Sequence, residues 1–259
     1  ILSLDAKSGI VEVQAGIQWP DLLSGLLRLQ KGRAAQWGIA QKQTGADRLT
    51  LGGALAANAH GRGLTMPPFV GDVDSFTLVD ASGRARRCSR TENGELFRLA
   101  AGGYGLFGVV TSLSLRLVPR RKIERVVEIE TLEKLMPAFE KRIRGGFLYG
   151  DFQFAIDAKS EDFLRRGVFS CYRPVADSVE IPAGQRALSR EDWGRLLVFA
   201  HTEKTRAFEE YAARHGYGVC GWGYPTSGAS SGWVTSSSAT LVVASGWLTA
   251  KLNTTMAPM

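Results

Sequence analysis

The chain has 259 residues, of which 44% are hydrophobic and 22% are charged, and its formal net charge is +7. This length suffices for one large domain or two smaller ones, and the composition is that of an ordinary globular protein. No run of about 18 apolar residues is present, so no transmembrane helix is expected. The longest basic run, at 120–122, is too short for an arm that binds nucleic acid, so we expect no nucleic-acid partner.

The cysteines and histidines are few and scattered. Cys88, Cys171 and Cys220 lie far apart without metal-like spacing, and the chain has three histidines. Such a set argues against a disulfide framework and favours a reducing compartment, so we expect a cytoplasmic protein without a metal site. The first residue is Ile1, and the sequence after it already resembles the interior of a domain. We therefore expect that an N-terminal part is missing, which leaves targeting open.

The first elements along the chain are a strand and a helix. Alternation of apolar and polar residues over 11–15 predicts a half-buried strand. Pro20 favours the start of a helix, which carries an apolar stripe of four leucines: Leu22, Leu23, Leu26 and Leu27. Residues 32–45 are polar and irregular, and a short strand is expected over 49–51.

The next stretch, residues 50–63, reads TLGGALAANAHGRG and contains four glycines. Gly52 and Gly53 permit a tight turn and a close approach to another surface, because they have no Cβ atom. The apolar run after them favours a helical turn, whose free N–H groups would suit a phosphate or an electron-rich ring. Asn58 and His60 add side-chain hydrogen bonding. The alternative is a structural turn with a core histidine, since short glycine patterns often arise by chance.

A hairpin and a second glycine cluster follow. Residues 76–88 have the pattern of two strands joined by a tight turn. A short helix within 91–101 leads into the cluster at 102–111, which reads GGYGLFGVVT. Alternating leucines over 113–117 predict the strand that leaves it, and Pro119 with the basic run marks a domain boundary.

Beyond this boundary the pattern changes. We expect strands at 127–130, 147–156 and 168–172, a helix at 132–143 that bends at Pro137, and a helix from about 202 to 216. Residues 218–259 contain no Asp, Glu, Arg or His and show no clear periodicity. One hypothesis is that this tail is not the native continuation of the domain, as in a frameshifted translation.

The order and spacing of these motifs resemble those of the FAD-linked oxidase family, the vanillyl-alcohol-oxidase or PCMH-type flavoproteins. The matching segments are 13–16 with 19–22, 50–61, 71–73 with 76–83, 93–97, and 102–111 with 113–119. The resemblance implies an α+β fold. In it, residues 1–120 form the second subdomain of an FAD-binding domain, 121–217 begin an α+β substrate domain, and 218–259 are an atypical tail.

The resemblance also implies a set of residues that bind FAD. By position, the pyrophosphate and ribityl region would be lined by Gly45, Thr50, Leu51, Gly52 and Gly53. The isoalloxazine ring would lie near Ala57, Asn58, Ala59 and His60. Val109 and Val110 would present backbone groups toward the adenine. Two alternatives stay open: His60 can be a satisfied structural histidine, and Val109 with Val110 can be the start of a buried strand.

By the same resemblance, the parent protein is an FAD-dependent oxidoreductase. It would oxidise a CH–OH group of a small alcohol, hydroxy acid, sugar or lactone by hydride transfer to the flavin, and oxygen or another acceptor would then reoxidise the flavin. No catalytic residue is assigned, because the family's first subdomain and its usual acid–base residues are absent from this sequence. The alternative is a truncated chain that binds FAD weakly or not at all and has no activity of its own.

Overall fold

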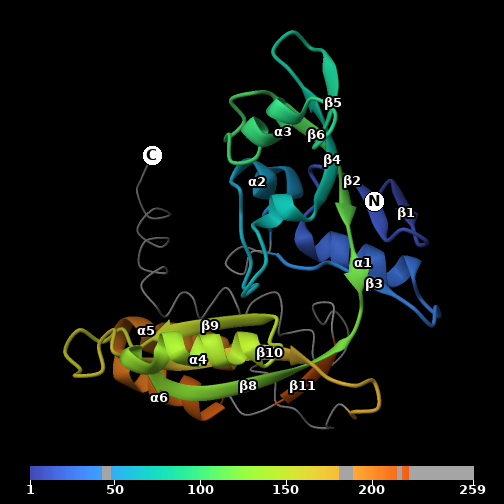
Figure 1. Cartoon of the computed structure of the whole chain (residues 1–259). Coiled ribbons are helices and arrows are strands. Elements are labelled where there is room, and N and C mark those ends of the chain that lie inside the picture. The colour runs from blue at the N-terminus through green and yellow to red at the C-terminus, as the bar shows by residue number, and fades with distance from the viewer. Residues whose placement is uncertain (43–47, 181–188, 215–217, 222–259) are drawn as a thin grey trace. The chain divides into compact units, whose positions relative to one another are not determined.

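The computed structural model describes residues 1–42, 48–180, 189–214 and 218–221 (Figure 1). The chain divides into two compact units, Ile1–Arg120 and Arg121–Met259. Each unit combines helices with an antiparallel sheet, in agreement with the predicted α+β class. Among the described residues, no helix is long and apolar enough to cross a membrane.

The first unit is built on a five-stranded antiparallel sheet with the strand order β1-β2-β6-β4-β5. The strands are β1 (Ser3–Asp5), β2 (Ile10–Gln14), β4 (Val73–Val79), β5 (Ala85–Ser89) and β6 (Val109–Arg116). A two-stranded ribbon joins β3 (Trp37–Gly38) to β7 (Val118–Pro119). One face of the sheet carries the buried row Val13, Leu113 and Phe76, and Phe76 stacks on Phe97 of a neighbouring helix with ring centroids 5.2 Å apart.

The helices of this unit are α1 (Trp19–Leu29), α2 (Leu51–Ala56), the 3-10 turn η1 (Phe69–Gly71) and α3 (Gly94–Ala100). The leucine stripe predicted for α1 faces the core: Leu22, Leu23 and Leu26 are buried. Burial of each such side chain stabilises the fold by about 2 kcal/mol. The predicted hairpin forms from β4 and β5, and its turn is fixed by the Asp80 carboxylate, which accepts hydrogen bonds from the backbone N–H groups of Ser82 and Arg84.

The prediction of a strand over 49–51 is wrong. Thr50 makes only an isolated bridge to Gln18, and the helix α2 begins at the next residue. Thr50 is its N-cap, because the Thr50 hydroxyl accepts a hydrogen bond from the N–H of Gly53 at 3.1 Å. A threonine cap satisfies a helix N–H that would otherwise lack a partner, so the chain turns into a helix at this point.

The second unit has helices on both faces of a four-stranded antiparallel sheet (Figure 1). Its strand order is β11-β8-β10-β9, with β8 (Lys122–Thr131), β9 (Tyr149–Phe154), β10 (Arg166–Pro174) and β11 (Gly218–Gly221). On one face, Phe139 of α4 (Leu132–Arg144) packs edge-on against Phe169 with ring centroids 4.8 Å apart. On the other face, Val168 packs with residues of α5 (Arg190–Thr202) and α6 (Lys204–Arg214).

The helix α6 confirms the helix expected from about 202 to 216, whereas α5, which starts at residue 190, was not predicted. Ser189 and Asp192 form a capping box there, in which each side chain accepts from the other residue's backbone N–H at 3.0 Å. The helix α4 confirms the helix expected at 132–143, and Pro137 lies inside it. Of the tail, residues 218–221 form β11, and the rest lies outside the described residues.

Candidate functional site

The two glycine clusters, about fifty residues apart in sequence, meet at the C-terminal end of α2. The N–H of Gly102 donates to the carbonyl of Leu55, and the N–H of Tyr104 donates to the carbonyl of Ala56, each at 3.0 Å. The last carbonyls of a helix have no partner within the helix. The loop at 102–108 therefore caps α2 and fixes its own position against that helix.

The residues at this junction have unusual backbone conformations. Asn58 and Tyr104 have φ angles of 45° and 49°, and Gly102 has a φ of 80°. Asparagine and glycine tolerate this left-handed region, whereas tyrosine adopts it rarely. A Cβ atom on Gly102 would lie 3.2 Å from the Cβ of Asn58, so the two segments are in contact. Strained backbone of this kind is concentrated at functional sites.

The second cluster needs its glycines for its own packing. A Cβ atom on Gly103 would lie 2.3 Å from the carbonyl oxygen of Leu99. Gly108 has a φ of 137°, and a Cβ atom on it would lie 2.4 Å from the carbonyl oxygen of Val79. At both positions a side chain would overlap the protein backbone. These two glycines therefore let the loop pack on the protein itself.

At the N-terminal end of α2, the free N–H groups that the sequence predicts are not present. The N–H of Leu51 donates to the Ile17 carbonyl at 3.0 Å, and that of Gly52 donates to the Ala15 carbonyl at 2.8 Å. The N–H of Gly53 is taken by the Thr50 hydroxyl. The prediction was wrong because the partners of the Leu51 and Gly52 N–H groups lie just after β2, more than thirty residues away in the chain.

Gly52 provides the close approach that the sequence predicts, and the surface that it approaches is part of the protein. A Cβ atom on Gly52 would lie 3.0 Å from the Cβ of Ala15, so glycine allows α2 to approach the end of β2. Leu51 has no exposed surface. The Leu51 side chain therefore packs in the core, and the expected contact of Leu51 with FAD stays a prediction. Gly45, the remaining residue predicted for the pyrophosphate, lies outside the described residues.

The segment after α2 differs, because its side chains are accessible. Ala57, Asn58 and His60 are exposed and Ala59 is half-buried. The N–H of Ala59 donates to the Ala54 carbonyl at 2.9 Å, which folds the segment back on the helix. The exposure of His60 contradicts the alternative of a core histidine.

The His60 ring has a defined hydrogen-bonding state. Its Nδ1 lies 3.1 Å from the carbonyl oxygen of Gly61. A carbonyl only accepts hydrogen bonds, so in the neutral ring Nδ1 carries the proton and Nε2 has the lone pair. This accessible side chain therefore offers an acceptor at Nε2.

Val109 and Val110 lie where strand β6 extends beyond its neighbour β2. They pair with Val79 and Leu78 of β4 on one side. On the other side the pairing with β2 reaches only Ser112, and the last contact is the N–H of Ala15 donating to the Thr111 carbonyl. Alternate residues of an antiparallel strand direct their backbone groups to opposite sides. One of the two valines therefore presents its N–H and carbonyl to an edge that β2 does not cover. Val109 is 68% exposed, which contradicts the alternative of a buried strand start.

The loop that returns from His60 to β4 is held by buried and charged groups that the sequence did not suggest. Arg90 donates to the carbonyls of Val70, Gly71 and Val73 at 2.8–3.3 Å. Burial raises the pKa of Asp72 to about 6, although the charge of Arg116 and a hydrogen bond to Gln41 act in the opposite direction. Arginines and a single aspartate in a strand-rich region carry no recognisable pattern, so only the fold shows this arrangement.

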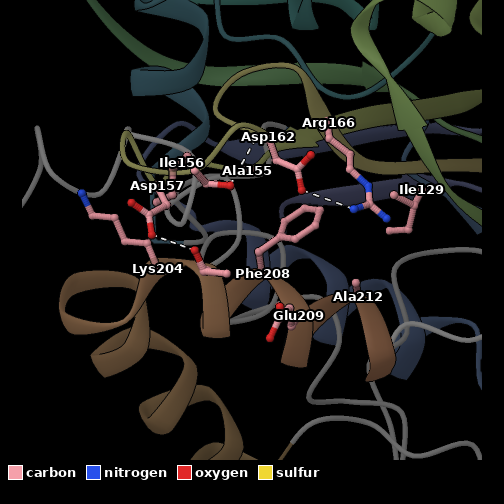
Figure 2. Close-up of a pocket in the computed structure, with 12 residues that line it drawn as sticks. Ile129, Ala155, Ile156, Asp157, Asp162, Arg166, Lys204, Phe208, Glu209 and Ala212 are labelled. Atoms are coloured by element: carbon pink, nitrogen blue, oxygen red, sulfur yellow. Dashed lines mark hydrogen bonds and ion pairs between the residues drawn. The ribbon is translucent and has the colours of Figure 1, made fainter.

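The second unit contains a pocket of about 320 Å³ between the end of its sheet and the start of α6 (Figure 2). Two of its carboxylates have partners: the Thr205 hydroxyl donates to Asp157 at 2.7 Å, and Arg166 pairs with Asp162 at 3.2 Å. No group of His, Cys, Asp or Glu within the described part of the chain could hold a metal ion.

Comparison with known proteins identifies the domain to which the first unit belongs. Residues 1–89 match the family model described as FAD binding domain. The chain is 31% identical over 126 residues to the uncharacterized oxidoreductase ORF5 in fasciation locus of Rhodococcoides fascians, a match that covers 49% of this chain and 27% of that protein. It is 26% identical over 145 residues to L-gulonolactone oxidase of Bos taurus, with 56% and 31% of the two chains covered.

A third relative is L-galactono-1,4-lactone dehydrogenase 1, mitochondrial, of Oryza sativa, which is 34% identical over 127 residues, with 48% and 20% of the chains covered. The chain thus spans between 20% and 31% of the length of these three relatives. The matched domain is one that binds FAD, and the motif order agrees with it. The family model covers residues 1–89 and the three relatives overlap about half of the chain, and these matches support a fragment of the FAD-linked oxidase family.

Proposed function

We propose that the whole protein is an FAD-dependent oxidoreductase that oxidises a CH–OH group of a small molecule, and that the segments 57–60 and 109–110 contact the cofactor. The observation that carries this proposal is the match of residues 1–89 to the FAD binding domain. Two relatives are named for lactones, L-gulonolactone and L-galactono-1,4-lactone. We therefore favour a sugar lactone, or the related sugar, as the substrate class over a simple alcohol or hydroxy acid.

The accessible residues after α2 fit the ring portion of FAD. Ala57 has a small side chain, and Asn58 and His60 supply a carboxamide and an imidazole to an exposed surface. A flat heteroaromatic ring with several donors and acceptors requires such a surface. When bound, the flavin accepts the hydride from the CH–OH carbon. The role of this chain is to position the ring: Asn58 and the Nε2 atom of His60 hydrogen-bond to its polar edge.

The N-terminal end of α2 fits the pyrophosphate less well, because the N–H groups of residues 51–53 already have partners. We therefore narrow the predicted cofactor residues to Ala57, Asn58, Ala59 and His60 with Val109 and Val110. Thr50, Gly52 and Gly53 support this segment by fixing the start of α2. We also propose that residues 1–120 are the second subdomain of the FAD-binding domain and that the following unit is the start of a substrate domain.

A second candidate is a chain that binds FAD and catalyses no reaction by itself. The share of the relatives' length that this chain spans, between 20% and 31% for three of them, favours it. The two candidates differ in one measurement. Anaerobic addition of L-gulono-1,4-lactone or L-galactono-1,4-lactone to the FAD-loaded chain would bleach the flavin absorbance if the chain is catalytic, and leave it unchanged if the chain only binds the cofactor.

Binding at the proposed segment is tested by titrating FAD into the chain and into the variant Asn58→Gly. Glycine keeps the left-handed backbone of Asn58 and removes only the carboxamide. We expect weaker binding by about tenfold, the effect of losing one or two hydrogen bonds to the ring. Equal affinity of the variant and the unsubstituted chain would contradict a flavin contact at Asn58.

A further inference from the structure

The second glycine cluster presents an aromatic side chain to solvent on a strained backbone. Tyr104 is 79% exposed, and its φ angle of 49° lies in a region that non-glycine residues rarely adopt. Its neighbours Leu106 and Val109 are 85% and 68% exposed. A tyrosine that served only to anchor the loop would be buried. We name these three exposed side chains the loop surface.

Hydrogen bonds of the backbone fix the loop that carries this surface. The N–H of Tyr104 donates to the Ala56 carbonyl at 3.0 Å, and that of Leu106 donates to the Gly103 carbonyl at 2.9 Å. The N–H of Gly103 in turn donates to the Ala100 carbonyl at 3.2 Å. The position of the Tyr104 backbone is therefore set by α2 and by the end of α3, and the exposed ring is part of an ordered structure.

Tyr104 also lies between the two segments that our proposed function assigns to FAD. Its N–H is bonded to the residue immediately before Ala57, which begins the segment 57–60. Five residues after Tyr104 the chain enters the segment 109–110. The loop at 102–108 is thus bonded beside the first segment and leads into the second. A single FAD molecule that contacts both segments therefore has to pass this loop. Stacking against an aromatic ring would bury the phenol and offset the cost of its strained backbone.

We infer that the Tyr104 ring packs against the isoalloxazine ring of FAD, so that the loop surface forms a second wall of the flavin site beside Asn58 and His60. This inference rests on the proposed function, because it requires the flavin to lie at the segment 57–60. It adds a residue outside the set that the sequence motif assigns. It also explains why a tyrosine, and not a third glycine, stands between Gly103 and Gly105.

Flavin fluorescence tests this contact independently of activity. A phenol in contact with an excited flavin donates one electron and recovers it, which quenches the emission without net chemistry. Tryptophan and tyrosine are the side chains that quench a flavin in this way. In the first unit Trp19 is buried and Trp37 is half-buried, so Tyr104 is the exposed one among its described residues. The measurement is the emission of bound FAD in the unsubstituted chain and in Tyr104→Phe and Tyr104→Leu, together with the FAD dissociation constant of each.

The two variants separate the effect of the aromatic ring from that of its hydroxyl group. Tyr104→Phe keeps an aromatic ring, so we expect nearly unchanged affinity and a several-fold rise in flavin emission. Tyr104→Leu removes the ring, so we expect the same rise and binding weaker by about tenfold. Because Tyr104 is exposed, both variants should unfold at the temperature of the unsubstituted chain. Phe163→Leu is the matched control, since Phe163 is an exposed aromatic residue of the second unit, and it should change neither property.

The outcomes distinguish the inference from the proposed function. If the unsubstituted chain binds FAD and both Tyr104 variants keep its affinity and its emission, the Tyr104 contact is refuted and the flavin site at 57–60 stands. If Phe163→Leu alters emission as much as the Tyr104 variants do, the quenching does not arise from a local contact and the inference is equally refuted. If the unsubstituted chain fails to bind FAD, both the inference and the proposed function fail.

Discussion

The two ends of helix α2 lie in one glycine-rich stretch of sequence and differ in the groups that they leave accessible. At its start, the N–H groups of residues 51–53 are consumed by Ile17, Ala15 and Thr50, and Leu51 is fully buried. At its end, the carbonyls are consumed by the second glycine cluster, but the side chains that follow are exposed. One end joins the helix to the sheet, and the other leaves the side chains of Asn58 and His60 exposed, where we propose that FAD binds.

This difference shows that a glycine in a cofactor motif does not by itself mark a contact with the cofactor. Gly52 provides room for Ala15, and Gly103 and Gly108 provide room for backbone carbonyls. In each case the close approach is between two parts of the protein. We propose that the exposed residues beside the glycines contact FAD, and each prediction below tests one part of this division between packing residues and binding residues.

The largest effect is expected at Gly108. The change Gly108→Ala should lower the free energy of unfolding by about 3 kcal/mol or more, because a φ of 137° suits only glycine and the new Cβ would overlap the Val79 carbonyl. Gly105→Ala is the control. Its φ of 81° is also positive, but its Cβ would meet no atom within 4 Å, so the cost should be about 1 kcal/mol. The free energy of unfolding of both variants is measured by chemical denaturation. If both variants lose the same amount, the contact with Val79 has no role.

The next effect concerns the buried end of α2. Gly52→Ala gains about 1 kcal/mol of helix propensity, but overpacking against Ala15 costs about 1–3 kcal/mol, so a net destabilisation of about 1 kcal/mol is expected. Gly194→Ala in α5 is the matched control, because its Cβ would meet nothing within 4 Å. That variant should be more stable than the parent by up to about 1 kcal/mol. If Gly52→Ala is more stable than the parent, the packing role that we assign to this glycine is contradicted.

Much of this division could not be predicted from sequence. Periodicity located the β2 strand, the leucine stripe of α1 and the hairpin of β4 and β5, because these depend on neighbours a few residues apart. The partners of the α2 N–H groups are Ile17 and Ala15, and no local pattern reveals contacts across more than thirty residues. The left-handed backbone of Tyr104 is equally invisible, since tyrosine gives no signal for it. The helix α5 was missed although Ser189 and Asp192 have the spacing of a capping box.

A smaller, pH-dependent effect is expected from Asp72, in the loop that leaves the exposed end of α2. Its folded-state pKa of about 6 lies above the value of an unfolded aspartate, about 3.9, so the folded state binds the proton more tightly. The stability that this group contributes is therefore present at low pH and is lost as the pH rises through about 6. Because the side chain is partly solvated, we expect a change of only about 1 kcal/mol.

The variant Asp72→Asn isolates this effect, since its side chain does not titrate. The measurement is the free energy of unfolding of the variant minus that of the parent, followed from about pH 4 to about pH 7. The difference should increase by about 1 kcal/mol in favour of the variant over this range. A constant difference would show that Asp72 has an ordinary pKa in the folded state.

The smallest effect on stability is expected at His60, where the division predicts a role in binding alone. His60 is exposed, and its recorded hydrogen bond is to the adjacent residue Gly61. His60→Ala should change the free energy of unfolding by less than about 0.5 kcal/mol, while FAD binds several-fold more weakly. A large loss of stability in denaturant titrations would assign His60 to the structural side of the division instead.

The most direct test of the central claim is the absorbance spectrum of the 259-residue chain after incubation with FAD and desalting, with Asn58→Gly measured alongside. We predict a flavin spectrum that stays with the unsubstituted chain and is reduced in the variant. A colourless chain, or a flavin signal of equal size in both proteins, would contradict the claim that the exposed end of α2 holds the cofactor.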